Sequence, residues 1–143
     1  MIAAIRIRGE VDKSKRVKDT FARLRLRKKH VCVLLPENPE TIGMLKRVKD
    51  FITYGNIDRE TLKLLVEKRA RLPGNKPAKV NDEFIEQLFN GKKKLSDGKL
   101  KPFFRLNPPR GGFGKGGIKV SFKAGGVLGN CGKEINVLIK KML

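Results

Sequence analysis

The residues with the strongest chemical character in this chain are cations gathered in a segment without acids. Between Gly98 and Lys133 the sequence has eight Lys or Arg, ten Gly and no Asp or Glu. Ammonium and guanidinium groups bind anions, and glycines let a backbone approach a partner closely. A nucleic-acid backbone fits this combination, because it presents a continuous row of phosphates. A solvated surface loop is the alternative interpretation of the same composition.

The whole chain is as basic as this segment. Its 143 residues include 34 Lys and Arg against 14 Asp and Glu, which gives a formal net charge of +20. Charge of one sign at this density destabilises a compact fold unless a polyanion offsets it. The polyanion could be nucleic acid, an anionic membrane surface or an acidic protein. A membrane is the weaker choice, because no apolar run approaches the roughly 20 residues that span a bilayer, and we expect no signal peptide at residues 1–5.

Catalytic and metal-binding chemistry has little support in the sequence. Residues 112–117 match the G-x-G-x-x-G dinucleotide fingerprint, but that fingerprint follows a strand and opens a helix, whereas this match follows two prolines. Cys32, Cys131 and the single histidine, His30, cannot supply four ligands to a zinc ion within the chain. His30 has no assigned acid or nucleophile partner, so a structural or RNA-facing role is the better interpretation. The residues therefore give no positive argument for an enzyme.

The elements that must position the cations alternate between strand and helix over residues 1–57. Residues 1–8 alternate in the manner of a half-buried strand, and residues 31–35 are apolar throughout, which is typical of a strand covered on both faces or central in its sheet. A third strand is expected at about 51–57. The helices between the strands each carry an apolar stripe, so we predict an α+β sandwich of the split-βαβ kind.

These two helices have clear local signals. Residues 13–27 place Val17, Phe21 and Leu24 at helical spacing, and the remaining positions are mostly basic, with Asp19 as the only acid. We favour phosphate contact over a solvated face for these cations. The second helix is expected to begin at Asn38, whose side chain can cap it, with a proline at the first helical position.

Beyond residue 57 we expect a C-terminal extension that packs on the core as one domain. The predicted parts of this extension are helices at about 58–69, 81–90 and 132–142 and a basic Gly-rich loop at about 98–130. Asp58 and Asn81 are the expected caps of the first two helices. Within the loop, residues 118–122 show a strand pattern.

Two blocks of the sequence are specific enough to indicate a family. The first runs from Val31 through Pro36-Glu-Asn-Pro-Glu40 to Phe51-Ile-Thr-Tyr-Gly55, and the second is Pro109-Arg110-Gly111-Gly112. The chain closely resembles the L thirty family of large-subunit ribosomal proteins along essentially its whole length. Its long form is similar to the archaeal and eukaryotic branch, whose eukaryotic member is called L seven. Because it lacks the long basic N-terminal extension of the eukaryotic relatives, we expect an archaeal source.

The resemblance implies a ferredoxin-like β-α-β-α-β core and a structural role in the large ribosomal subunit, in the cytoplasm. It implies large-subunit rRNA close to 5S rRNA and neighbouring ribosomal proteins as partners, and no membrane, small-molecule substrate, cofactor or catalysis. Two other functions stay open from the residues: a free-standing nucleic-acid or chromatin-associated module, and a phosphate-handling enzyme. The Gly-rich loop favours the ribosomal protein, because free modules rarely keep such long segments that become ordered on binding.

Under this interpretation we expect RNA contacts mainly to phosphates. Phe113, which lies between two glycines, is a candidate either for insertion against a sugar or base or for a small hydrophobic anchor within the protein. The residues that we predict to bind RNA are Arg8, Lys13, Lys15, Arg16, Arg23, Arg27, Lys28, Lys29, His30, Lys101, Arg105, Arg110, Phe113, Lys115, Lys119 and Lys123.

Overall fold

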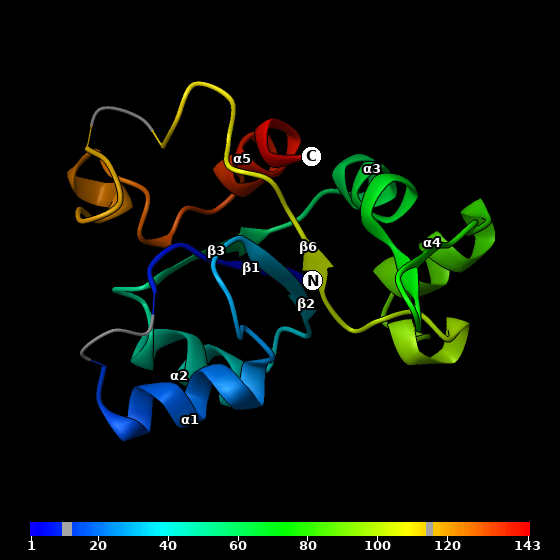
Figure 1. Cartoon of the computed structure of the whole chain (residues 1–143), viewed down its shortest axis with the longest axis horizontal. Coiled ribbons are helices and arrows are strands. Elements are labelled where there is room, and N and C mark those ends of the chain that lie inside the picture. Colours follow the sequence, from blue (N-terminus) through cyan, green and yellow to red (C-terminus); the bar gives the residue numbers. More distant parts are fainter. Residues whose placement is uncertain (10–12, 114–115) are drawn as a thin grey trace.

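A five-stranded sheet lies at the centre of this computed structural model, which describes residues 1–9, 13–113 and 116–143 (Figure 1). The strands, in their order across the sheet, are β6 (Phe104–Arg105), β2 (Val31–Leu35), β1 (Ile2–Arg6), β3 (Ile52–Asn56) and β7 (Gly129–Asn130). β1 pairs antiparallel with β2 and β3, β6 pairs antiparallel with β2, and β7 runs parallel to β3. The predicted α+β class with a ferredoxin-like β-α-β-α-β core is confirmed.

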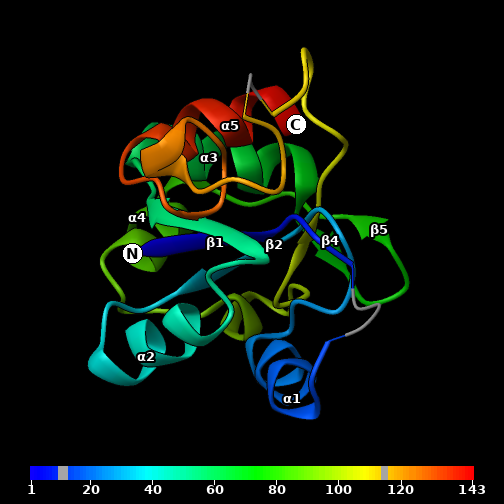
Figure 2. The same cartoon turned by 90° about the vertical axis from the view of Figure 1, so that its left-hand side faces the viewer.

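Two helices cover one face of this sheet. α1 (Lys15–Leu24) and α2 (Pro39–Arg47) lie together below the strands (Figures 1 and 2). Phe21 from α1 and Leu45 from α2 are fully buried in one hydrophobic cluster with the lower side of the sheet. Asn38 caps α2 as expected, because its Oδ1 accepts a hydrogen bond from the Thr41 N–H at 2.8 Å.

α3 (Arg59–Arg69) and α5 (Glu134–Met142) cover the opposite face, and α4 (Asp82–Phe89) packs against α3 beside the sheet (Figure 1). Asn81 caps α4 by accepting a hydrogen bond from the Phe84 N–H at 3.2 Å. Asp58 precedes α3 without making a side-chain cap; instead its backbone N–H donates to Asn136 Oδ1 of α5 at 2.8 Å. This bond joins the start of α3 to α5.

The first strand differs from the half-buried strand that its alternation predicts. All five residues of β1 are buried, because helices cover both faces of the sheet. Arg6 is 1% exposed, and its guanidinium donates to the carbonyl oxygens of Leu26 at 2.8 Å and Arg8 at 2.9 Å. The same group lies 4.2 Å from the centroid of the Phe21 ring. Arg6 is therefore a structural cation, whose burial is compensated by hydrogen bonds and ring contact.

Segments between the helices also contain structure that the sequence pattern did not indicate. A hairpin of β4 (Arg71–Leu72) and β5 (Lys76–Pro77) joins α3 to α4. The strand expected at 118–122 is wrong: this segment forms turns and enters a 3-10 helix at Phe122–Ala124. The reason is that Val120 O accepts hydrogen bonds from the N–H groups of Val127 and Leu128, so the chain folds back locally instead of extending.

Candidate nucleic-acid interface

Two acid-free segments meet where β6 pairs with β2. Residues 20–36 contain five Lys or Arg and no acid, and residues 98–133 contain no acid either. Val31 pairs with Arg105, and the carbonyl oxygen of His30 accepts a hydrogen bond from the N–H of Leu106 at 3.1 Å. Strand pairing therefore brings cations from distant parts of the chain to one edge of the sheet.

The first of two pockets at this edge lies between the end of α1 and β6. Its lining residues are Arg25, Arg27, Lys28, Val31, Pro102, Phe103 and Arg105. The four cations are all exposed, whereas the valine is buried and the proline and phenylalanine are half-buried. The pocket thus has a basic rim and an apolar floor.

The second pocket lies beside the first, against the hairpin. Its lining residues are Arg69, Arg71, Asn75, Lys101, Phe103 and Arg105. Lys101 fixes the hairpin to the strand that leads into β6, since its N–H donates to Arg71 O at 2.9 Å and its Nζ to Asn75 Oδ1 at 2.5 Å. Within the part of the chain that the structure describes, no acidic side chain lines either pocket.

The two pockets share Phe103 and Arg105 and are therefore neighbours, and we call them together the basic groove. Its residues are Arg25, Arg27, Lys28, Arg69, Arg71, Lys101, Phe103 and Arg105. Lys101 Nζ lies 6.0 Å and Arg105 Cζ 5.9 Å from the centroid of the Phe103 ring. The groove can hold anionic groups along its length and a flat apolar group at its middle.

One residue that lines each pocket has its backbone in the left-handed region. Arg25, which ends α1, has φ 63° and Asn75, in the hairpin turn, has φ 62°. Glycine is the usual residue in the first of these positions. An arginine in this position raises the conformational energy of the folded chain. Contact of its guanidinium with a bound partner would offset that cost.

The second basic surface lies on α1. Lys15, Arg16 and Arg23 line a shallow depression with Asp19, Thr20 and Arg47 of α2. Lys13 Nζ lies 4.0 Å and Arg8 Cζ 5.6 Å from the centroid of the Phe51 ring. Arg8 and Lys13 therefore share one aromatic contact, and neither lines the basic groove.

His30 and Phe113 contact each other. Their rings stack with centroids 6.1 Å apart and an angle of 6° between the planes. Burial, and then the nearby charge of Lys29, lower the pKa of His30 below its usual value, so the imidazole is neutral at neutral pH. Phe113 also packs against the cluster under α3 and α5, so the structure shows the hydrophobic anchor. A contact of Phe113 with RNA stays a prediction.

The other predicted residues that the structure describes do not line the groove. Arg110 is exposed, and its N–H donates to Lys141 O at the end of α5 at 3.1 Å. Lys119 and Lys123 are exposed in the segment drawn in orange in Figure 1, on the opposite side of the sheet from α1. Lys29 is exposed beside Gly9. Lys115 lies outside the described residues.

The groove thus unites four of the predicted residues: Arg27, Lys28, Lys101 and Arg105. It adds Arg25, Arg69, Arg71 and Phe103, which are absent from the list of predicted RNA-binding residues. Arg25 belongs to the basic positions of residues 13–27 for which phosphate contact is favoured, and Phe103 is a close neighbour of a selected cation in an acid-free segment. Arg69 and Arg71 carry no such signal, since α3 and β4 bring them to the groove from elsewhere.

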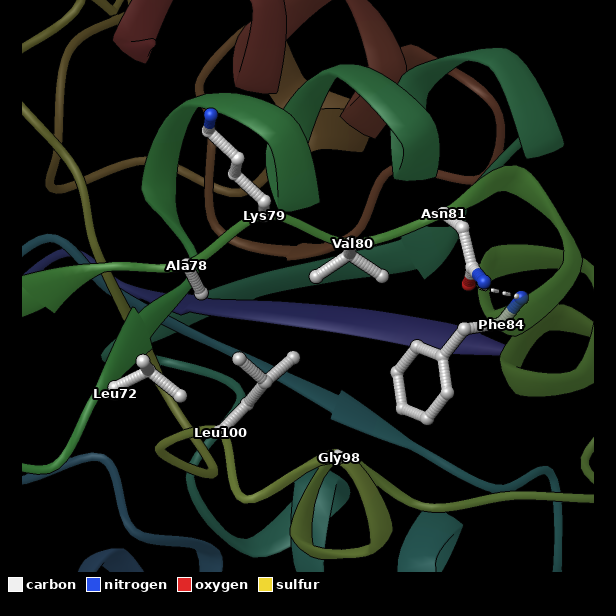
Figure 3. A pocket seen from close by; sticks show the side chains of 8 residues that line it. All are labelled: Leu72, Ala78, Lys79, Val80, Asn81, Phe84, Gly98 and Leu100. Carbon is white, nitrogen blue, oxygen red and sulfur yellow. Dashed lines mark hydrogen bonds between the residues drawn. The ribbon is translucent and has the colours of Figure 1, made fainter.

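A further hollow, outside these surfaces, is mainly apolar. Leu72, Val80, Phe84 and Leu100 direct side chains into it from the hairpin, α4 and the segment before β6, while Lys79 points away (Figure 3). Such a hollow offers packing surface and no general acid or base.

The described residues give little support for metal binding or thiol chemistry. Among the residues that the structure describes, no group of His, Cys, Asp and Glu is placed to hold a metal ion. Burial raises the pKa of Cys32 to about 12, so its thiol stays protonated. The helices of the described ranges are too short or too polar to cross a membrane.

Comparison with known proteins gives one consistent result. The family model described as "Ribosomal protein L30p/L7e" matches residues 2–52. A large ribosomal subunit protein uL30 from Methanococcus vannielii is 43% identical, covering 99% of this chain and 98% of its own length. The protein of that name from Methanosphaera stadtmanae is 42% identical over the whole of both chains, and that from Methanopyrus kandleri is 38% identical over 96% of this chain and all of its own.

Proposed function

Because the chain belongs to the ribosomal protein L30p/L7e family, we propose that its basic groove binds large-subunit rRNA. Membership of this family gives the protein a structural role in the large ribosomal subunit, in the cytoplasm, as the sequence predicted. We further propose that it lies close to 5S rRNA and to neighbouring ribosomal proteins. The resemblance of the sequence to this family supports that placement. It also supports the division of the chain at residue 57 into a core and an extension.

The observation that carries the groove assignment is its charge. Cations from the segment after α1, from the end of α3, from the hairpin and from in and just before β6 converge on two neighbouring pockets that have no acidic lining residue among the described ranges. Arginine, the commonest cation there, presents a planar fork that matches phosphate geometry. RNA bound along the groove would therefore be held mainly through its backbone, with α1 as a second contact surface.

The test is the salt dependence of binding to large-subunit rRNA. Contact with about five to eight phosphates should make log K fall linearly with log salt, by roughly 0.7–0.9 per phosphate. A groove variant that combines Arg25→Gln, Lys28→Gln and Arg105→Gln should lower this slope by about three. The matched control combines Lys46→Gln, Lys49→Gln and Lys140→Gln, which removes the same charge from exposed positions that line neither pocket.

Two results would contradict the assignment. The first is an equal decrease of the salt slope in the groove variant and in the control, which would mean that binding depends on the total charge and not on the groove. The second is duplex DNA binding as tight as rRNA binding, which would favour a free-standing nucleic-acid module. Sedimentation of the native protein in cell extract adds an independent check, since a ribosomal protein should migrate with ribosome-sized particles at low and high salt.

A further inference from the structure

We propose that Phe103 is a stacking platform for one unpaired nucleotide of the RNA, while the cations of the two pockets hold the phosphates on either side. The inference rests on the proposed function, because it specifies what the same groove recognises. It concerns the kind of RNA structure that is bound.

The position of Phe103 in the chain presents its ring to the groove. Side chains alternate between the two faces of a strand, and the next residue, Phe104, is buried in the cluster under α3 and α5. Phe103 packs on the cluster on the other side of the sheet and stays half-buried. The ring is thus fixed along one side and reachable from both pockets, which share it.

The charges around the ring are arranged on two sides. Arg25, Arg27 and Lys28 line the first pocket, and Arg69 and Arg71 line the second. A nucleotide has a phosphate on each side of its base. Cations in both pockets can therefore bind consecutive phosphates while the base between them lies on the ring.

The chemistry of phenylalanine selects unpaired nucleotides. A fully paired helix covers the faces of its bases by stacking, and the deep, narrow major groove of A-form RNA keeps side chains from the base edges. An aromatic ring engages RNA where a base is unstacked and its face is free. Because the ring has no hydrogen-bonding group, it should favour unpaired over paired RNA with little preference among bases.

The chain offers a direct reporter, because it contains no tryptophan. Phe103→Trp introduces a single indole whose emission should be quenched by a stacked base. The probes are a blunt RNA duplex and the same duplex with one unpaired adenosine. Quenching of the full-length variant with the second probe and not with the first supports the proposal.

Affinity gives the second readout. Wild type should bind the duplex with the unpaired adenosine about tenfold or more tightly than the fully paired one, since stacking on an aromatic side chain is worth that much per base. Phe103→Leu should abolish this ratio, whereas Phe103→Tyr should keep it. Equal thermal midpoints of the variants show that the fold is intact.

The outcomes separate this proposal from the one on which it rests. If wild type prefers neither duplex, or if Phe103→Leu keeps the preference, the stacking platform is wrong and the phosphate-binding groove stands. Arg25→Gln should weaken binding to both duplexes equally. If it has no effect on either, and binding has no salt dependence, the groove assignment itself fails.

Discussion

Replacing Arg25 by glycine should strengthen the fold and weaken RNA binding. Arg25 ends α1 with φ 63° and ψ 24°, where its N–H donates to the carbonyl oxygen of Ala22. A side chain in the left-handed region costs about 1–2 kcal/mol, which glycine avoids. Glycine also gives the unfolded chain more freedom, which offsets about 0.4–1 kcal/mol of that gain. The backbone hydrogen bond is kept, so the free energy of unfolding should rise by up to about 1.5 kcal/mol.

The assay measures both quantities on one preparation. Urea denaturation followed by circular dichroism gives the free energy of unfolding, and titration with rRNA at several salt concentrations gives the slope of log K. Loss of one phosphate-binding cation should lower that slope by about one. If Arg25→Gly destabilises the protein by more than about 1 kcal/mol, or leaves the slope unchanged, the reasoning fails.

Lys99→Gly is the matched control. Lys99 has φ 56°, follows the 3-10 helix at Leu95–Gly98 and lines neither pocket. Its replacement removes the same charge from the same backbone conformation. The stability should therefore rise by a similar amount, while the slope of RNA binding stays at the wild-type value.

Three further predictions concern the fold. Because the pKa of His30 is lowered in the folded protein, the unfolded chain takes up a proton first, and the free energy of unfolding should fall as pH drops below about 6.5. His30→Gln should reduce this fall when urea denaturation is compared at neutral and mildly acidic pH. A pH profile identical to that of the wild type would contradict this prediction. Leu45→Ala should cost about 2–5 kcal/mol in the same assay, because Leu45 is fully buried, and a loss below about 1 kcal/mol would mean that its cluster adjusts freely. Gly55→Ala should lower the free energy of unfolding by about 1–3 kcal/mol, because the added Cβ would collide with the backbone carbonyl of Gly132. The salt dependence of RNA binding should stay unchanged, since this contact lies at the opposite edge of the sheet from the groove.

The parts of the fold that could be predicted have local causes. Asn38 followed by proline sets the start of α2, and Phe21 with Leu24 defines the buried side of α1. β6 and β7 could not be predicted, because two residues have no readable period and their pairing depends on distant partners. The burial of Arg6 could not be predicted for a related reason: one of the carbonyl groups that bind its charge belongs to Leu26, and the ring that it contacts belongs to Phe21.

The candidate site divides in the same way. Basic, acid-poor composition selected Arg27, Lys28, Lys101 and Arg105, which line the groove, but it also selected Lys29, Arg110, Lys119 and Lys123, which line neither pocket. Composition has no information on which cations face each other. That depends on the β2–β6 pairing, which is also what gives Phe103 its place between two basic pockets.

The long connections of the sheet set an order of folding. β1, β2 and β3 are close in sequence, whereas β6 and β7 each join a partner more than seventy residues away. Closing such loops is entropically costly and slows the late steps of folding. In a chain synthesised from its N-terminus, β6 can dock before β7 has been made. All of the groove residues, from Arg25 to Arg105, precede β7 in the chain, so the RNA-binding surface does not require the last strand, and bound RNA can help the rest of the chain to fold.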